Sequence, residues 1–171
     1  EICACLVGSE MCIRDSIESS LPLRDCIRAC NELFFMNREE ERTVSLDLME
    51  LNQYTGECHF YKCGASASYW IRHGQIHEIA ADRQPLGLSS VPSEFDEVLY
   101  LESGDTVILI SDGIAEEFYE RPELLRAGME RLKTENPTDL ATGILELAVK
   151  AAGAIRDDMT VLVVSLYQED N

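Results

Sequence analysis

The chain has 171 residues, of which 46% are hydrophobic and 27% charged, the composition of an ordinary soluble globular domain. Its 32 acidic residues outnumber 14 basic residues and give a formal net charge of −18. Such a negative surface repels phosphate backbones and anionic lipids, which argues against nucleic acid and direct membrane contact and leaves cations as partners. No apolar run reaches the about 20 residues needed to span a bilayer.

The seven cysteines do not follow the pattern of a disulfide framework. Their number is odd, their spacing is irregular, and there is no C-x-x-C pair or Cys/His cluster at zinc spacing. Cysteines that stay reduced are typical of the cytosol. We therefore expect a cytoplasmic domain.

The first 15 residues, EICACLVGSEMCIRD, show neither helical nor strand periodicity, and the chain begins at Glu1 rather than Met. The piece VGSEMCIRDS is similar to translated adaptor sequence at the ends of unrelated proteins. We expect residues 1–16 to be a foreign or unstructured segment, and residues 17–171 to form the domain.

Apolar residues at helical spacing from Leu23 predict a first helix that ends near Asn37. Three strand pairs are predicted next, and the first begins with the half-buried alternation of Val44, Leu46 and Leu48. Turn signals place these pairs in the ranges 43–64, 68–80 and 95–111. Two helices, over 121–132 and 136–153, and a last apolar strand over 159–167 complete an α+β order.

Two predicted strands carry carboxylates at their ends. Asp112 follows the apolar run that ends at Ile110, and Asp157 and Asp158 precede the last strand, 45 residues later. If these strands are antiparallel neighbours, Asp112 and Asp157 converge at one sheet edge. Convergent carboxylates need a cation between them or a shared proton. Hard divalent ions such as Mg²⁺ or Mn²⁺ suit that setting.

Each carboxylate also has a structural explanation. Asp112 could cap a short helix that begins at Gly113, because aspartate is a favoured N-cap residue. Asp157 and Asp158 could form a solvated turn before the strand. The spacing alone does not decide between these alternatives and a metal site.

The stretches ILISDGIAE and RDDMTVLVVSL together resemble the last two signature motifs of the metal-dependent PPM-type serine/threonine phosphatases. LDLMELNQYTGECHFYKCGASASYWIRHGQIHEI, followed by QPLGL, is similar in order and spacing to phosphatase domains of the stage II sporulation protein E type. The resemblance extends from about Leu23 to Leu166. It implies a PPM-like fold, a central β-sandwich of antiparallel strands flanked by helices, here incomplete at the N-terminus.

The resemblance also implies chemistry and partners. Two Mn²⁺ or Mg²⁺ ions would activate a water that attacks phosphoserine on an anti-anti-sigma-factor-like protein. The positions matching metal-binding residues are Asp112, Gly113 and Asp157, with Asp158 beside them, and no other catalytic residue is implied. The full-length relative would be membrane-anchored through segments outside this domain.

One part of the family pattern is not matched. The family opens with an aspartate-glycine motif whose aspartate bridges both metals, and nothing in residues 1–22 resembles it. We therefore expect a truncated domain that binds metal weakly and turns over little or nothing. Two alternatives remain open: a catalytically inactive PPM-like module that binds a partner protein, and a stress-response regulator phosphatase.

Overall fold

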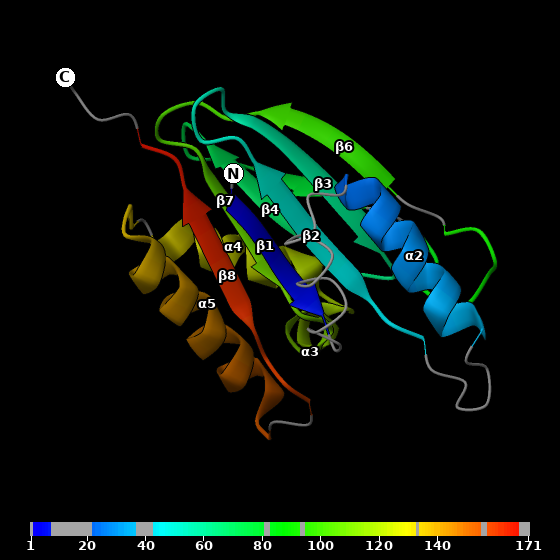
Figure 1. Cartoon of the computed structure of the whole chain (residues 1–171). Coiled ribbons are helices and arrows are strands. Elements are labelled where there is room, and N and C mark those ends of the chain that lie inside the picture. The colour runs from blue at the N-terminus through cyan, green and yellow to red at the C-terminus, as the bar shows by residue number, and fades with distance from the viewer. Residues whose placement is uncertain are drawn as a thin grey trace. The chain divides into compact units, whose positions relative to one another are not determined.

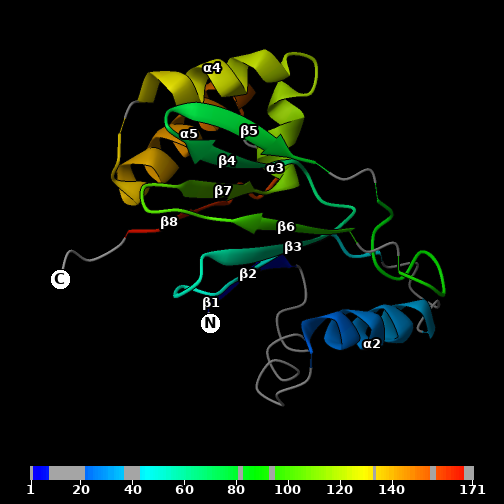
Figure 2. The same ribbon diagram turned by 90° about the horizontal axis from the view of Figure 1, so that it is seen from above.

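The computed structural model describes residues 2–7, 22–36, 43–80, 83–92, 95–132, 134–154 and 157–167. The strands form two four-stranded sheets, in the orders β1-β2-β3-β6 and β5-β4-β7-β8 (Figure 1 and Figure 2). Every strand pair with an assigned register is antiparallel. The expected fold class, antiparallel sheets flanked by helices, is confirmed.

The chain divides into two compact units that alternate along the sequence. The first takes its described residues from 1–51, 58–65 and 81–98, and the second from 52–57, 66–80 and 99–171. Composition alone favoured one domain, whereas the structure distributes the elements over two interleaved units.

The first unit contains β1 (Ile2–Val7), α2 (Leu23–Met36), β2 (Leu46–Leu51), β3 (Glu57–Cys63) and most of β6 (Phe95–Tyr100). The predicted first helix is confirmed, and one of its faces packs on β2 and β3. The buried cluster between helix and sheet comprises Ile27, Cys30, Leu46, Leu48, Tyr61, Cys63 and Leu86. The fully buried Asn31 accepts a hydrogen bond from Gly87 N–H and donates one to the Ser89 carbonyl, which fixes that loop on α2.

Two expectations for this unit change. Residues 2–7 pair with β2 as strand β1, so an unstructured state is wrong for these six residues; residues 8–16 lie outside the described part of the chain. Strand β2 is not half-buried, because Asp47 is buried together with Met49 on the face away from Leu46 and Leu48. The burial of Asp47 is made possible by Lys62, directly opposite on β3, whose Nζ lies 2.7 Å from Asp47 Oδ2.

The second unit contains β4 (Ser68–Arg72), β5 (Gln75–Ile79), β7 (Thr106–Ile110) and β8 (Val161–Ser165). Its helices are α3 (Asp112–Ala115), the 3₁₀ turn η2 (Glu116–Phe118), α4 (Pro122–Leu132) and α5 (Pro137–Ala152). A buried cluster joins α4 and α5 to the sheet and comprises Tyr69, Ile76, Ile108, Ile110, Ile114, Phe118, Leu125, Met129, Leu140, Ile144 and Ala148. The predicted cap of α5 is confirmed, since the Asn136 side chain accepts hydrogen bonds from the backbone of Thr138 and Asp139.

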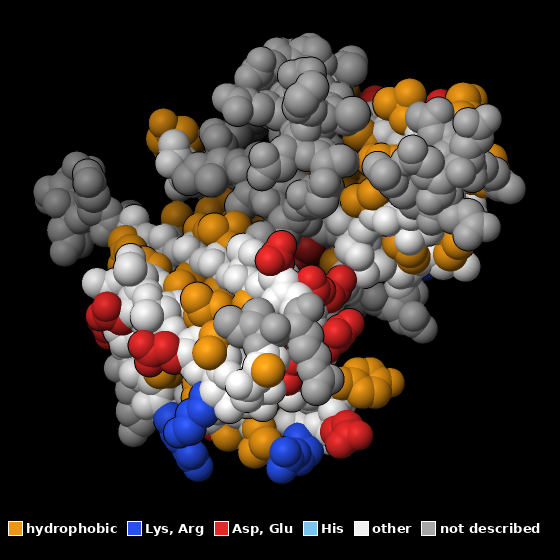
Figure 3. All heavy atoms as spheres, turned by 90° about the horizontal axis from the view of Figure 1, so that it is seen from below, with side chains coloured by type: hydrophobic (Ala, Val, Ile, Leu, Met, Phe, Trp, Pro, Cys, Tyr) orange, Lys and Arg blue, Asp and Glu red, His pale blue; other side chains and the backbone are white. Residues whose placement is uncertain are grey.

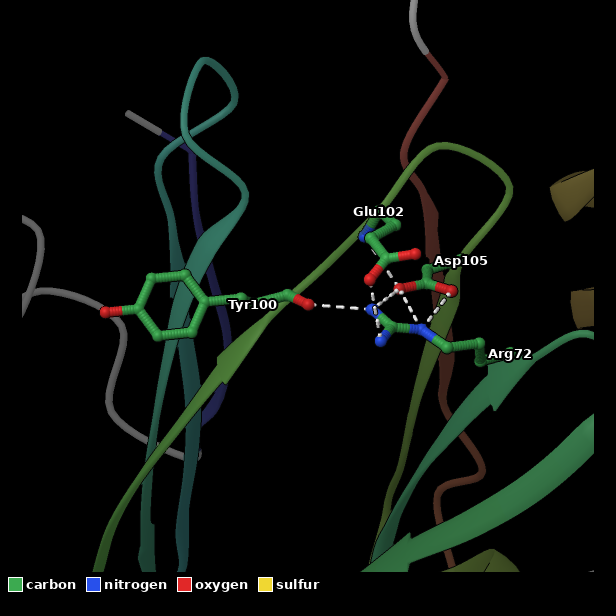
Figure 4. A network of polar contacts seen from close by, with 4 residues as sticks. All are labelled: Arg72, Tyr100, Glu102 and Asp105. Carbon is green, nitrogen blue, oxygen red and sulfur yellow. Dashed lines mark hydrogen bonds and ion pairs between the residues drawn. The ribbon is translucent and has the colours of Figure 1, made fainter.

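The predicted hairpin over 95–111 is wrong, because β6 and β7 belong to different sheets. The connection between them is fixed to β4 by Arg72, which forms hydrogen bonds to the Asp105 carboxylate and the Tyr100 carbonyl and an ion pair with Glu102 (Figure 4). Burial raises the pKa of Asp105, but hydrogen bonds from Arg72 and from the Glu102 N–H outweigh that effect and lower it. Asp105 therefore remains ionised although its side chain is only 3% exposed.

No helix in the described residues is both long enough and apolar enough to cross a bilayer.

Candidate functional site

The candidate site lies where β7 ends and β8 begins. These strands are antiparallel neighbours, and their ladder ends with Ile110 opposite Val161. Asp112 leaves β7 at this edge, and the segment 157–160 enters β8 at the same edge. The topological condition for bringing Asp112 and Asp157 together is thus met.

Gly113 lies directly against the segment that carries Asp157. A Cβ atom added to Gly113 would be 2.5 Å from the carbonyl oxygen of Asp158 and 3.4 Å from Cβ of Asp157. Real Cβ atoms essentially never approach another atom this closely, so only glycine fits here without a shift of the backbone. The glycine of the Ser-Asp-Gly stretch therefore allows the two carboxylate-bearing segments to touch.

Ser111 joins the same two segments by three hydrogen bonds. Its N–H donates to the Thr160 carbonyl at 3.0 Å, and its hydroxyl accepts from the Thr160 N–H at 2.9 Å. The hydroxyl also donates to the Asp158 carbonyl at 3.1 Å. These bonds extend the β7–β8 pairing by one residue and hold the two loops in a fixed register.

Asp112 is half-buried and receives a hydrogen bond from outside this strand pair. The hydroxyl of Ser66, on the loop before β4, donates to Asp112 Oδ1. Asp157 and Asp158 are exposed, and Asp157 Oδ1 accepts the backbone N–H of Asp158 at 2.8 Å. The two predicted ligand carboxylates thus differ in environment: one is held by a neighbouring loop, and the other is open to solvent.

Of the two structural explanations, the helix cap does not hold for Asp112, whereas the solvated turn does hold for Asp157 and Asp158. The short helix begins at Asp112 itself, and Ser111 occupies the cap position without a side-chain cap bond, so Asp112 is not its N-cap residue. A solvated turn does describe Asp157 and Asp158, which are both exposed. The turn and a ligand role are compatible, because a metal ligand must reach solvent to receive the ion.

Negative charge is concentrated at this edge. Figure 3 shows the molecule from the end at which α3 lies in Figure 1, and acidic side chains gather on this face. Glu116 is exposed and Glu117 half-buried, and both follow Asp112 in the next turn. Such a field raises the local concentration of cations and opposes the approach of a phosphorylated substrate unless a cation is present.

Asp112, Gly113 and Asp157 carry oxygen atoms of the kind that a hard divalent cation binds. Carboxylate and carbonyl oxygens are the ligands that Mn²⁺ and Mg²⁺ prefer. In the portion of the chain that the structure describes, no three His, Cys, Asp or Glu side chains gather closely enough to hold a metal. The assignment of Asp112, Gly113 and Asp157 as ligands of a cation therefore remains a prediction.

Sequence reasoning did not identify Ser66 or Ser111. Both are small polar residues beside a strand end, a pattern that is too common to indicate a site. Ser111 had one usable signal, its place directly before Asp112 and Gly113. Ser66 had none, since its contact with Asp112 spans 46 residues.

Comparisons with known proteins identify the family and support the fold of this chain. The family model "Stage II sporulation protein E (SpoIIE)" matches residues 5–167, which include most of the segment expected to be foreign or unstructured. Stage II sporulation protein E of Bacillus subtilis is 32% identical over 157 residues, which cover 88% of this chain and 19% of that protein. The chain therefore spans about a fifth of the length of this curated relative.

Two solved structures of the Bacillus subtilis protein match the fold. The PP2C phosphatase domain with a fragment of the regulatory domain is 27% identical with a TM-score of 0.81, covering 91% of this chain and 48% of that one. The phosphatase domain presoaked with Mn is 27% identical with a TM-score of 0.67, covering 93% of this chain and 72% of that one. From the matching motifs, the shared fold and the family model, the chain belongs to the stage II sporulation protein E family, whose solved members carry PP2C-type phosphatase domains.

Proposed function

We propose that this domain is a metal-dependent protein-serine phosphatase that hydrolyses phosphoserine on an anti-anti-sigma-factor-like protein. The observation that carries the proposal is that the segments bearing Asp112 and Asp157 lie side by side where β7 ends and β8 begins, with Gly113 packed against the Asp158 carbonyl. Family membership supports the class of reaction, and the structure of the Bacillus subtilis phosphatase domain presoaked with Mn supports the class of metal.

In this proposal Asp112 and Asp157 hold Mn²⁺ or Mg²⁺, and the backbone at Gly113 lies close enough to contribute. A bound divalent cation supplies charge neutralisation for the phosphate and an activated water. Hydrolysis forms a bond from the water oxygen to phosphorus and breaks the ester bond to the serine oxygen, which leaves as a hydroxyl. Ser111 and Gly113 keep the two ligand segments together during this exchange, and Asp158 contributes its carbonyl to the Ser111 hydroxyl.

The negative charge of the chain restricts the class of phosphorylated substrate that it can bind. A chain with a formal charge of −18 and an acidic edge disfavours phosphorylated polyanions such as nucleic acids. A single phosphoserine on a compact protein carries about two negative charges, which a bound divalent cation can compensate. A small phosphoprotein of the anti-anti-sigma-factor type meets this requirement.

A second function is favoured by one observation. The described residues form no group of three metal-binding side chains, which agrees with a site that holds fewer ligands than a firmly bound ion needs. A catalytically inactive module that binds a partner protein would keep the same fold. The two functions differ in phosphate release, not in shape.

The test uses the whole 171-residue chain with Mn²⁺ and a phosphoserine peptide. Binding of Mn²⁺ is followed by the electron paramagnetic resonance signal of the free ion, and hydrolysis by released phosphate. We expect weak Mn²⁺ binding that falls at least about tenfold in Asp112→Asn and in Asp157→Asn. Glu146→Gln removes one exposed charge on α5 and is the matched control.

Phosphate release that requires Mn²⁺ and is lost in Asp112→Asn supports the phosphatase. Mn²⁺ binding without any release supports the inactive module instead. If Asp112→Asn binds Mn²⁺ as tightly as Glu146→Gln does, the assigned metal ligands are wrong.

A further inference from the structure

Ser66 stands at the same sheet edge as the candidate ligands, one strand away from them. Strand β4 pairs with β7, and Tyr69 lies opposite Ile108. Continuing this antiparallel register past the strand ends places residue 66 beside residue 111, just as the β7–β8 register places residue 111 beside residue 160. Three neighbouring strands therefore reach the same edge, where the Ser66 side chain contacts Asp112 and the Ser111 side chain contacts the segment before β8.

The Ser66 hydroxyl uses this position to donate a hydrogen bond to Asp112 Oδ1. Its loop is held in place on the β4 side, where Ser68 is fully buried and Tyr69 is 8% exposed within the core of this unit. A donor on a fixed loop restricts the rotation of the carboxylate that it contacts. The hydrogen bond from Ser66 links Asp112 to the loop before β4. The hydrogen bonds of Ser111 link the end of β7 to the segment that enters β8.

We propose that Ser66 is a positioning residue for metal binding, which orients the Asp112 carboxylate toward a cation shared with Asp157. This inference rests on the proposed function, because it assumes that Asp112 is a ligand. Groups that hydrogen-bond to metal ligands fix ligand orientation, and their removal typically costs 10- to 100-fold in metal affinity. A hydroxyl that only stabilised the loop would affect unfolding instead of affinity.

The experiment measures Mn²⁺ affinity and thermal unfolding on the same variants of the whole chain. Ser66→Ala removes the donor, Ser66→Cys replaces it with a weak donor of similar shape, and Ser66→Thr retains the hydroxyl. The matched control is Ser165→Ala, which breaks the 2.9 Å hydroxyl pair with Thr106 at the opposite end of the same sheet. Affinity is read from the electron paramagnetic resonance signal of free Mn²⁺, without any turnover.

We expect Ser66→Ala to weaken Mn²⁺ binding by about 10-fold or more and Ser66→Cys to weaken it by a smaller factor. Ser66→Thr and Ser165→Ala should stay within about threefold of the parent, and the melting temperatures measured without metal should differ little between Ser66→Ala and Ser165→Ala. A loss of Mn²⁺ affinity in Ser66→Ala without a matching loss of melting temperature is the result that a positioning role predicts.

Three results would overturn the proposal, and they separate its failure from that of the proposed function. If Asp112→Asn loses Mn²⁺ binding while Ser66→Ala keeps the parent affinity, only the role of Ser66 is wrong. If Ser165→Ala weakens binding as much as Ser66→Ala does, a general loosening of the sheet explains the effect. If the parent chain shows no Asp112-dependent Mn²⁺ binding, both the proposed metal site and the proposed role of Ser66 are wrong.

Discussion

Replacing Gly113 with alanine tests the close approach on which the candidate site depends. The added Cβ would be 2.5 Å from the Asp158 carbonyl oxygen and 3.2 Å from its carbonyl carbon, and both are backbone atoms that cannot rotate away. Overpacking of this kind costs about 1–3 kcal/mol. Alanine is favoured over glycine in a helix by up to about 1 kcal/mol, which offsets part of that cost because Gly113 is the second residue of a short helix.

The expected net effect of Gly113→Ala is a loss of about 1–2 kcal/mol in the free energy of unfolding. For a chain of this size, this lowers the melting temperature by about 2–8 °C. The two ligand segments must also move apart to admit the methyl group, so Mn²⁺ affinity should fall. Differential scanning calorimetry and the electron paramagnetic resonance titration measure the two effects.

Gly128→Ala provides the matched control for this substitution. Gly128 also lies in a helix, and its added Cβ would be 2.6 Å from Cδ1 of Leu147, the end of a flexible side chain that can change rotamer. We expect a near-neutral change in stability and an unchanged Mn²⁺ affinity. If Gly113→Ala melts at or above the parent temperature and binds Mn²⁺ equally well, the close approach does not exist in solution.

Two further predictions concern buried ionisable groups. Arg72→Ala should destabilise the chain by about 2–3 kcal/mol at neutral pH, because it leaves the buried Asp105 carboxylate without its ion pair. The lowered pKa of Asp105 means that its stabilisation is present above its unfolded pKa of about 3.9 and is lost as the pH falls through the folded value. The stability difference between parent and variant, followed by urea unfolding, should therefore shrink below about pH 4. Burial raises the pKa of the Cys58 thiol to about 12, so peptide mapping after iodoacetamide treatment at pH 8 should find Cys58 unmodified in the folded chain and modified in urea.

Each of these predictions has its own control and its own contradicting result. Glu130→Ala breaks an ion pair with Arg126 on an exposed helix face, and a surface pair of this kind contributes little. Equal losses in Arg72→Ala and Glu130→Ala would contradict the assigned importance of the Asp105 contact. Rapid modification of Cys58 in the native chain would show that β3 opens to solvent.

The sequence predicted local features of the fold well where a single periodic pattern or a strong boundary residue was present. Apolar spacing from Leu23 identified α2, and Asn136 with Pro137 identified the start of α5. The turn at His73 and Gly74 was also correct, and both residues adopt the positive φ that a two-residue hairpin turn requires. These features depend on neighbours in the chain, so they can be deduced from a short window.

The sequence failed where pairing depends on distant residues. The ranges 95–100 and 106–110 read as a hairpin because only a short turn separates them, yet they join different sheets. Arg72 with Asp105 fixes the connection between these ranges to β4, and Asp47 with Lys62 accompanies the burial of β2 on both faces. The charges of all four side chains suggest solvent exposure. A buried ion pair has no signature in one sequence, because each partner alone resembles a surface residue.

The candidate site shows the same division. Asp112, Gly113 and Asp157 could be proposed from their places at strand ends together with the family resemblance, and their assignment as ligands remains a prediction. Ser66 could not be found, because serine beside a strand end is common and its partner lies 46 residues away. Ser111 had only its place before Asp112 and Gly113 as a signal, and the partner of its hydroxyl lies 47 residues away.

The separation of β4, β7 and β8 along the chain also determines when the candidate site can exist during folding. Ser66, Asp112 and Asp158 come from three separate parts of the sequence, and the pairs β4–β7 and β7–β8 must both form before these residues meet. Long-range pairing of this kind is slow. An ion that binds only the completed edge adds a stabilisation of RT ln(1 + [L]/Kd), about 2.7 kcal/mol at one hundred times Kd. Binding of a divalent cation would then stabilise fully folded chains, whose distant strands are in register, relative to compact folding intermediates in which these strands are not yet paired.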